Sequence, residues 1–217
     1  MHKPNNLLEL DVKDELDWDP MIDDDRIVVK ADDGRVTLTG TVPSYYEATR
    51  AADDAWTVGG VRDVDNELLV GLLGDAITDT DIMAACVIAL DADKFVPPGS
   101  VTAVADRGWV TLTGQVRHHY QRQAAKHAVR QVDGVLGVTD DIEISSEPIP
   151  SDVADRINNA FRRNAIIDES LIDVSNTGHT IYLDGTVGSY QAREQAVQTA
   201  WDAPGVTDVV DRLVIAP

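Results

Sequence analysis

The sequence predicts an α+β protein built from three tandem copies of one small αββαβ domain. Two observations carry this prediction. A β-rich segment with a glycine near its end recurs at residues 36–42, 110–116 and 181–187, and a Gly-Val pair follows each of these glycines 20 residues later. Since chance does not keep one register over a whole chain, the repeat places the copies at 1–74, 75–147 and 148–217. The glycines that mark the register are Gly40, Gly60, Gly114, Gly134, Gly185 and Gly205.

The first element expected in each copy is an amphipathic helix. The register aligns copy one with copy two at an offset of 74 residues, and copy two with copy three at 71. Apolar residues then recur at i, i+4 and i+8, which is the spacing of one helix face. These residues are Leu8, Val12 and Leu16, then Ile82, Cys86 and Leu90, then Val153, Ile157 and Phe161.

A β-hairpin is expected next, because alternating apolar residues lead into turn chemistry and then into the glycine-bearing strand. The alternating pairs are Ile27 and Val29, Val101 and Ala103, and Ile172 and Val174. The turns lie at residues 32–34, 106–108 and 176–178. Copy three departs from the pattern, because Gly178 comes one position early and Asp184 replaces a threonine. Its turn type therefore stays open.

A second helix and a last alternating strand complete each copy. Ser44 and Ser189 are expected N-caps. The inward helix faces carry Ala51 and Ala55, Ala125 and Val129, and Ala196 and Ala200. The strands carry Val64, Asn66, Leu68 and Val70, then Val138, Asp140, Ile142 and Ile144, then Val209, Asp211, Leu213 and Ile215. Short linkers at 71–75 and 145–150, the second rich in proline, indicate limited freedom between copies.

Composition excludes one class of function. The chain has 38 Asp and Glu against 18 Lys and Arg, a formal net charge of −20, which repels phosphate backbones. General nucleic-acid binding is therefore not expected. The acidity is greatest in copy one, where 7 basic residues face 17 acidic ones, and it is consistent either with a need for solubility or with a saline habitat.

Two further features bear on the compartment and on reactivity. The single cysteine, Cys86, lies on an apolar helix face with no electropositive residue nearby in the sequence, so we expect an inert core thiol. The N-terminus lacks an apolar h-region, and no stretch approaches 18 uncharged apolar residues. If Met1 is the native start, no signal peptide and no transmembrane span are expected.

The combination of a turn with glycine, a V-x-L-x-G-x-V strand, a helix and a G-V-x-x-V strand closely resembles the BON family, named for bacterial osmotic-stress and nodulation proteins. The resemblance covers nearly the whole chain three times. It implies a small three-stranded mixed sheet with two helices on one face, no catalytic machinery, and roles in envelope maintenance, phospholipid association or protein assembly. Family members are usually exported, whereas this chain is expected in the cytoplasm, or in the periplasm if a signal has been removed.

No motif in the sequence favours catalysis or a cofactor. The nucleophile elbow, the P-loop, the dinucleotide fingerprint and the H-E-x-x-H motif are all absent from the sequence.

The repeated glycines indicate a bend or a close approach of the crossing helix. Acidic runs at 23–25, 32–33 and 91–93 lack the calcium-loop pattern and are expected to be solvated turns. His118 and His119 diverge on a helix, so we expect a surface pair and no metal site.

The second helices carry opposite chemistry in different copies. One stripe reads Tyr45, Ala48, Ala52 and Trp56 in copy one, and Tyr190, Arg193, Val197 and Trp201 in copy three. In copy two it becomes a basic ridge of His119, Arg122, Lys126 and Arg130. The stripes are interpreted either as extensions of each core or as interfaces, and the ridge either as a solvated face or as a contact for an acidic partner or lipid.

These features support one leading hypothesis and two alternatives. The leading hypothesis is a non-enzymatic, stress-related binding and assembly protein that docks through Tyr45, Trp56, Tyr190 and Trp201, either between domains or between chains. The first alternative is peripheral association with phospholipid through the basic ridge of copy two, against which the net charge weighs. The second is binding of a cation such as potassium, a role associated with one cytoplasmic relative of the family.

Overall fold

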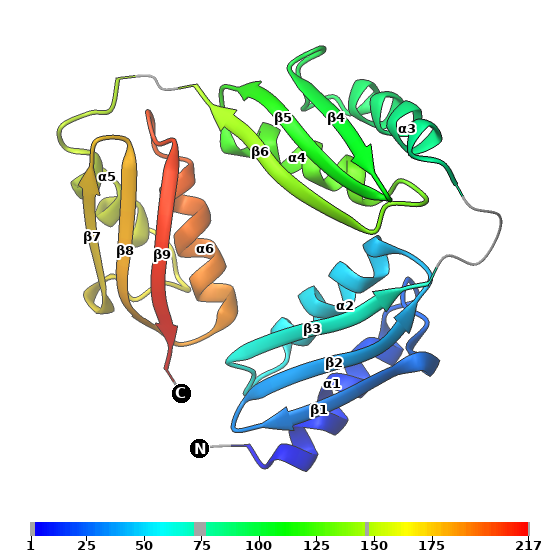
Figure 1. Ribbon diagram of the computed structural model, residues 1–217. Helices are drawn as coiled ribbons and strands as arrows, with labels where there is room; N and C mark the ends of the chain where they lie inside the picture. The colour runs from blue at the N-terminus through cyan, green and yellow to red at the C-terminus, as the bar shows by residue number, and fades with distance from the viewer. Residues whose placement is uncertain (1–2, 72–76, 146–147, 217) are drawn as a thin grey trace. The chain divides into compact units, whose positions relative to one another are not determined.

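The computed structural model describes residues 3–71, 77–145 and 148–216, and in these it contains three sheets, each with two helices on one face (Figure 1). Copy one consists of α1 (Asn5–Trp18), η1 (Asp24–Arg26), β1 (Ile27–Asp32), β2 (Arg35–Val42), α2 (Tyr45–Thr57) and β3 (Asp63–Val70). Copy two consists of α3 (Asp79–Ala92), β4 (Val101–Asp106), β5 (Trp109–Val116), α4 (His119–Arg130) and β6 (Gly137–Ile144). Copy three consists of α5 (Val153–Phe161), η2 (Glu169–Leu171), β7 (Ile172–Thr177), β8 (Thr180–Val187), α6 (Tyr190–Trp201) and β9 (Asp208–Ile215). The αββαβ order and the α+β class are as the sequence predicts.

Each sheet is mixed, with the glycine-bearing strand in the middle. β1 pairs antiparallel with β2, and β2 pairs parallel with β3. The same antiparallel pairing joins β7 to β8, and the same parallel pairing joins β8 to β9. The parallel pair requires a crossover connection, and the second helix of the copy supplies it.

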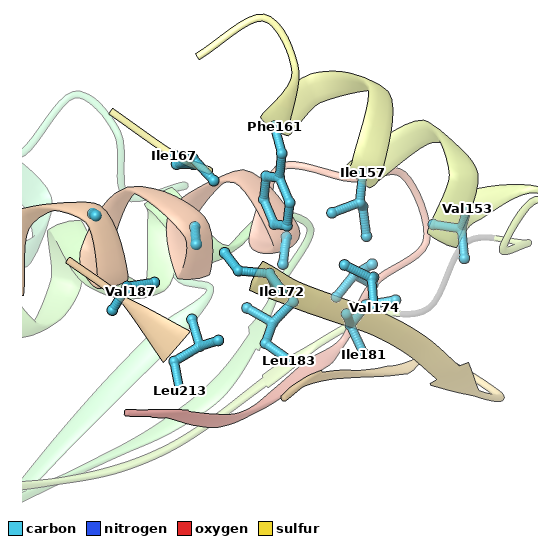
Figure 2. Packing of buried hydrophobic residues seen from close by; sticks show 14 residues of the cluster. Val153, Ile157, Phe161, Ile167, Ile172, Val174, Ile181, Leu183, Val187 and Leu213 are labelled. Carbon is cyan, nitrogen blue, oxygen red and sulfur yellow. The ribbon is translucent and has the colours of Figure 1, made fainter. Parts of the chain in front are cut away.

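The helix positions predicted to face inward are buried. Leu8, Val12 and Leu16 of α1 are 0% exposed, and the equivalent residues of α3 and α5 are buried as well. The small side chains of Ala196 and Ala200 let α6 lie close to the sheet, so that Phe161 of α5 can fill the remaining space. Figure 2 shows this core in copy three, where side chains from two helices and three strands meet over the inner face of one sheet.

The hairpin turns explain why copy three departs from the repeat. In copies one and two, both central residues have a positive φ, at Asp33 and Gly34 and at Arg107 and Gly108, which is the type I′ geometry. In copy three Gly178 has a φ of 57°, whereas its neighbour His179 does not share the positive φ. Glycine one position early therefore gives a type II′ turn that still closes a two-residue hairpin.

The strand glycines have a common structural reason. Gly40, Gly114 and Gly185 have φ values of 129°, 140° and 131°. A Cβ atom there would lie 2.0 to 2.1 Å from a backbone carbonyl oxygen of Arg26, Ser100 or Leu171. The close approach comes from the residue just before the first strand and not from the crossing helix, which corrects the expectation from sequence.

The helix caps follow the predicted chemistry. The Ser44 hydroxyl accepts a hydrogen bond from the Glu47 N–H at 3.2 Å, and the Ser189 hydroxyl accepts one from the Ala192 N–H at 3.1 Å. A further cap at Thr78 forms a reciprocal capping box with Asp81 ahead of α3. These caps fix where each helix begins.

The described residues fall into two compact units. Residues 1–116 and 120–142 form the first, which holds copy one and most of copy two, and residues 117–119 and 143–217 form the second. Much of both predicted linkers, at 72–75 and 146–147, lies outside the described residues. Within the described ranges, no helix is both long and apolar enough to cross a bilayer.

Candidate interaction surfaces

The aromatic residues at the ends of α2 and α6 lie at the boundary between core and surface. Trp56 packs, partly buried, against the core of copy one, and Trp201 packs in the same way against the core of copy three. Tyr45 and Tyr190 begin the two helices and are also half-buried. Each tryptophan therefore has one side on its own core, and its interface role remains a prediction.

Two cations of the predicted basic ridge bind a carboxylate of their own domain. The Arg122 guanidinium donates from Nε to Asp140 Oδ2 at 2.7 Å, and Lys126 Nζ lies 3.5 Å from the same oxygen. The Asp140 side chain, on β6, is only 8% exposed. Asp140 thus balances one positive charge of this ridge within copy two, a contact that the sequence did not predict.

The same strand-to-helix contact recurs in all three copies, and we call it the strand–helix latch. In copy three Arg193 Nε donates to Asp211 Oδ2 at 2.7 Å. In copy one Asn66 takes the place of the aspartate and donates from Nδ2 to the Ala48 carbonyl at 2.6 Å. In each copy Oδ1 of the same side chain accepts the backbone N–H two residues further on, at Leu68, Ile142 or Leu213. The signal in the sequence was a polar residue at an inward position of the last strand.

The last cation of the ridge, Arg130, lies near an acidic residue of copy one within the first compact unit. Burial raises the pKa of Asp53 on α2, and the nearby charges of Arg130 and Arg50 oppose that rise. A hollow of about 240 Å³ lies close by, between the start of α2 and the turn that leads into β6. It is lined by Pro43, Ser44, Ile77 and residues 132–135.

His119 is not the surface residue that the sequence suggested. Its side chain is 8% exposed, whereas His118 is exposed. The His119 ring, which clusters with residues 143–217, stacks on the Trp201 indole with ring centroids 3.9 Å apart and planes at 9°. This stacking buries the imidazole, so His119 is not available for contact with a lipid.

One carboxylate pair was not anticipated. Asp19, which follows α1, accepts hydrogen bonds from the Met21 N–H and from Arg50, and these outweigh burial and lower its pKa. Asp54, one turn beyond Arg50 on α2, has its pKa raised to about 6, first by burial and then by the neighbouring Asp19. In the described part of the chain Oδ2 of Asp54 is buried without a hydrogen-bond partner.

The remaining reactive groups offer little chemistry. Burial raises the pKa of the Cys86 thiol to about 11, so the thiol stays protonated and unreactive at neutral pH. Among the described residues, no group of three or more histidine, cysteine, aspartate or glutamate side chains is placed to hold a metal ion.

Comparisons with known proteins agree with the repeat. The model of the BON domain matches three times, at residues 5–71, 78–146 and 151–217. Osmotically-inducible protein Y of Escherichia coli K12 is 34% identical over 126 residues, which cover 54% of this chain and 61% of the relative. The chain thus spans less than two thirds of the length of that curated relative.

Two solved structures of CdsD, a structural protein of the type III secretion system of Chlamydia trachomatis, also align with the chain. The C-terminal domain is 16% identical, with 97% of this chain and 98% of that chain covered and a TM-score of 0.27. The second structure is 16% identical, with 98% and 93% covered and a TM-score of 0.27.

Proposed function

This chain belongs to the BON domain family, and we propose that it is a non-enzymatic binding and assembly protein whose three BON domains dock on one another or on sister chains. The docking elements are the second helices α2, α4 and α6. The similarity to a protein named for osmotic induction supports a role under osmotic stress.

The observation that carries the proposal is the packing of two BON copies into one compact unit. The sheets of copies one and two are separate, so the association of these two copies depends on contacts outside the sheets. The charge of Arg130 on α4 acts on Asp53 of α2, which is the pairing of basic and acidic surfaces that orients docking.

The aromatic residues would supply most of the binding energy. Trp56 and Trp201 are only partly covered by their own cores, and tryptophan and tyrosine are the usual anchors of protein interfaces. Exposed charge pairs contribute about 0–1 kcal/mol each, so Arg130 would set orientation more than affinity.

The two alternative functions have less support. Phospholipid association relied on a free basic ridge, yet Arg122 and Lys126 share Asp140 and His119 is stacked on Trp201. Sedimentation with anionic and neutral vesicles, at low and at physiological salt, tests whether the chain binds phospholipid. Potassium binding stays a separate prediction, and calorimetric titration with K⁺, Ca²⁺ and Mg²⁺ tests it.

The docking proposal is tested by small-angle scattering combined with light scattering. Replacing Trp56 and Trp201 with alanine should increase the radius of gyration or lower the mass of the assembly, because the anchors are lost. Arg130→Gln should mainly change the dependence on salt, since it removes a screened charge. Arg107→Gln is the matched control, because this arginine is highly exposed. Identical radius, mass and salt response in all variants would contradict the proposal.

A further inference from the structure

The outward face of α1 carries an acidic stripe that ends in apolar side chains, and we call it the α1 stripe. It consists of Leu7, Asp11, Asp14, Glu15 and Trp18, spaced at i, i+4, i+7, i+8 and i+11 along one helix face. Leu7 is 47% exposed and Trp18 is 83% exposed, the highest value among the large apolar residues described as exposed. The buried face of the same helix holds Leu8, Val12 and Leu16.

A hollow adjoins this stripe. Its volume is about 570 Å³, and it lies between α1 and the end of α2, lined by Lys3, the last four residues of the stripe and residues 57–59. Lys3 forms an ion pair with Asp11 and donates to the Gly59 carbonyl at 3.1 Å, so its charge is held at one end of the hollow. Asp14 and Glu15 are exposed beside Trp18.

The stripe is specific to copy one. The aligned positions of copy two read Asp81, Ala85, Ile88, Ala89 and Ala92, and those of copy three read Asp152, Arg156, Asn159, Ala160 and Arg163. Neither keeps three carboxylates between two large apolar side chains. The equivalent helix therefore has a different outer surface in each copy, although its inner face is apolar and buried in all three.

We propose that the α1 stripe is a docking surface for a basic amphipathic polypeptide segment of a protein partner. This inference rests on the proposed function, because it takes the chain to be a binding protein. It adds the chemical class of one protein partner. Charge complementarity selects the occupant: three carboxylates against one lysine line the hollow, in the copy that carries half of the net charge of −20.

The spacing of the stripe defines the partner further. Leu7 and Trp18 are eleven residues apart on a helix, so the two apolar contacts are separated by about 16 Å. A partner segment therefore needs two apolar anchors at that separation with lysine or arginine between them. A cation beside Trp18 gains from the face of the indole ring as well as from Asp14 and Glu15.

Fluorescence anisotropy with a synthetic probe tests the inference on the full chain. The probe is a helical peptide with two leucines eleven positions apart and three lysines between them on one face. We expect saturable binding that weakens about fivefold or more in Trp18→Ala and in the Asp14→Asn, Glu15→Gln double variant. A peptide of the same composition with its leucines moved to the opposite face should bind more weakly by a similar factor.

Matched controls separate this surface from general attraction to an acidic protein. Asp141→Asn with Glu143→Gln removes two exposed charges from copy two, and Leu69→Ala removes an exposed apolar side chain from copy one. Both should change affinity less than about twofold. Equal weakening by the control and stripe variants, or no effect of Trp18→Ala, would overturn the inference. Such a result leaves docking through α2 and α6 intact, because the scattering experiment measures different surfaces.

Discussion

At the scale of single residues, Asp54 and Asp19 show how two neighbouring carboxyl groups acquire opposite properties. Arg50 and the Met21 N–H hold Asp19 in its charged form. Asp54 therefore lies, partly buried, beside the negative charge of Asp19. A protonated Asp54 carboxyl could donate a hydrogen bond to Asp19. The negative charge of Glu15 on α1 acts in the same direction.

This arrangement predicts a pH dependence of stability in copy one. The pKa of Asp54 rises from 3.8 to about 6 in the folded state, so the folded protein binds a proton more readily than the unfolded chain. Its contribution to the free energy of unfolding is therefore present below about pH 4 and is lost as the pH rises through about 6. Asp54→Asn should remove that loss and stabilise the protein at pH 7 to 8 by about 1 kcal/mol, allowing for solvent screening.

Urea denaturation between pH 4 and pH 8 measures this difference. The matched control is Asp25→Asn, which neutralises an exposed aspartate of the same copy. The lowered pKa of Asp19 affects stability as the pH falls below about 5, so the interval from pH 5 to pH 8 reports on Asp54. Parallel stability curves for wild type and Asp54→Asn would contradict the assignment.

At the scale of elements, the strand–helix latch ties the last strand of each copy to its second helix. Asp211→Ala in copy three removes the acceptor for both Arg193 and the Leu213 N–H. We expect a loss of about 1–2 kcal/mol in the free energy of unfolding, because both contacts are partly buried. Asp211→Asn should cost less than Asp211→Ala, since Asn66 keeps the backbone contact in copy one.

Denaturant midpoints of the variants check the latch. Asp184→Ala is the control, because Asp184 pairs with Arg212 at 3.7 Å on an exposed surface. It should change stability by no more than about 0.5 kcal/mol. If Asp211→Ala costs no more than Asp184→Ala, the latch does not stabilise the domain.

The sequence was sufficient to predict the elements but not all their contacts. The period of α1, the caps at Ser44 and Ser189, and the alternation of the strands are local properties, so the copies could be placed without a structure. The sequence did not predict the latch, because tertiary packing brings the side chains of α4 and β6 together and no local pattern reports that contact. Burial of His119 was missed for the same reason, since its partner Trp201 is distant in sequence.

At the scale of the whole molecule, the chain divides into two compact units although it contains three BON matches. The sheet and the helices of copy one lie entirely in the first unit, and those of copy three in the second. The fragment 1–147 should therefore fold and melt cooperatively in the absence of copy three. Circular dichroism and calorimetry of that fragment check this expectation, and a random-coil spectrum would refute it.

The latch also constrains the order in which its residues can change during divergence of the copies. Loss of Arg193 first would leave Asp211, whose side chain is 21% exposed, as a partly buried anion without its cation. Conversion of the aspartate to asparagine first avoids that state, because the amide keeps the backbone contact and carries no charge, as Asn66 shows. The arginine can then become alanine, as at Ala48. An Asp–Arg pair and an Asn–Ala pair are therefore connected by single substitutions through an Asn–Arg intermediate, whereas an Asp–Ala intermediate leaves the carboxylate without its arginine.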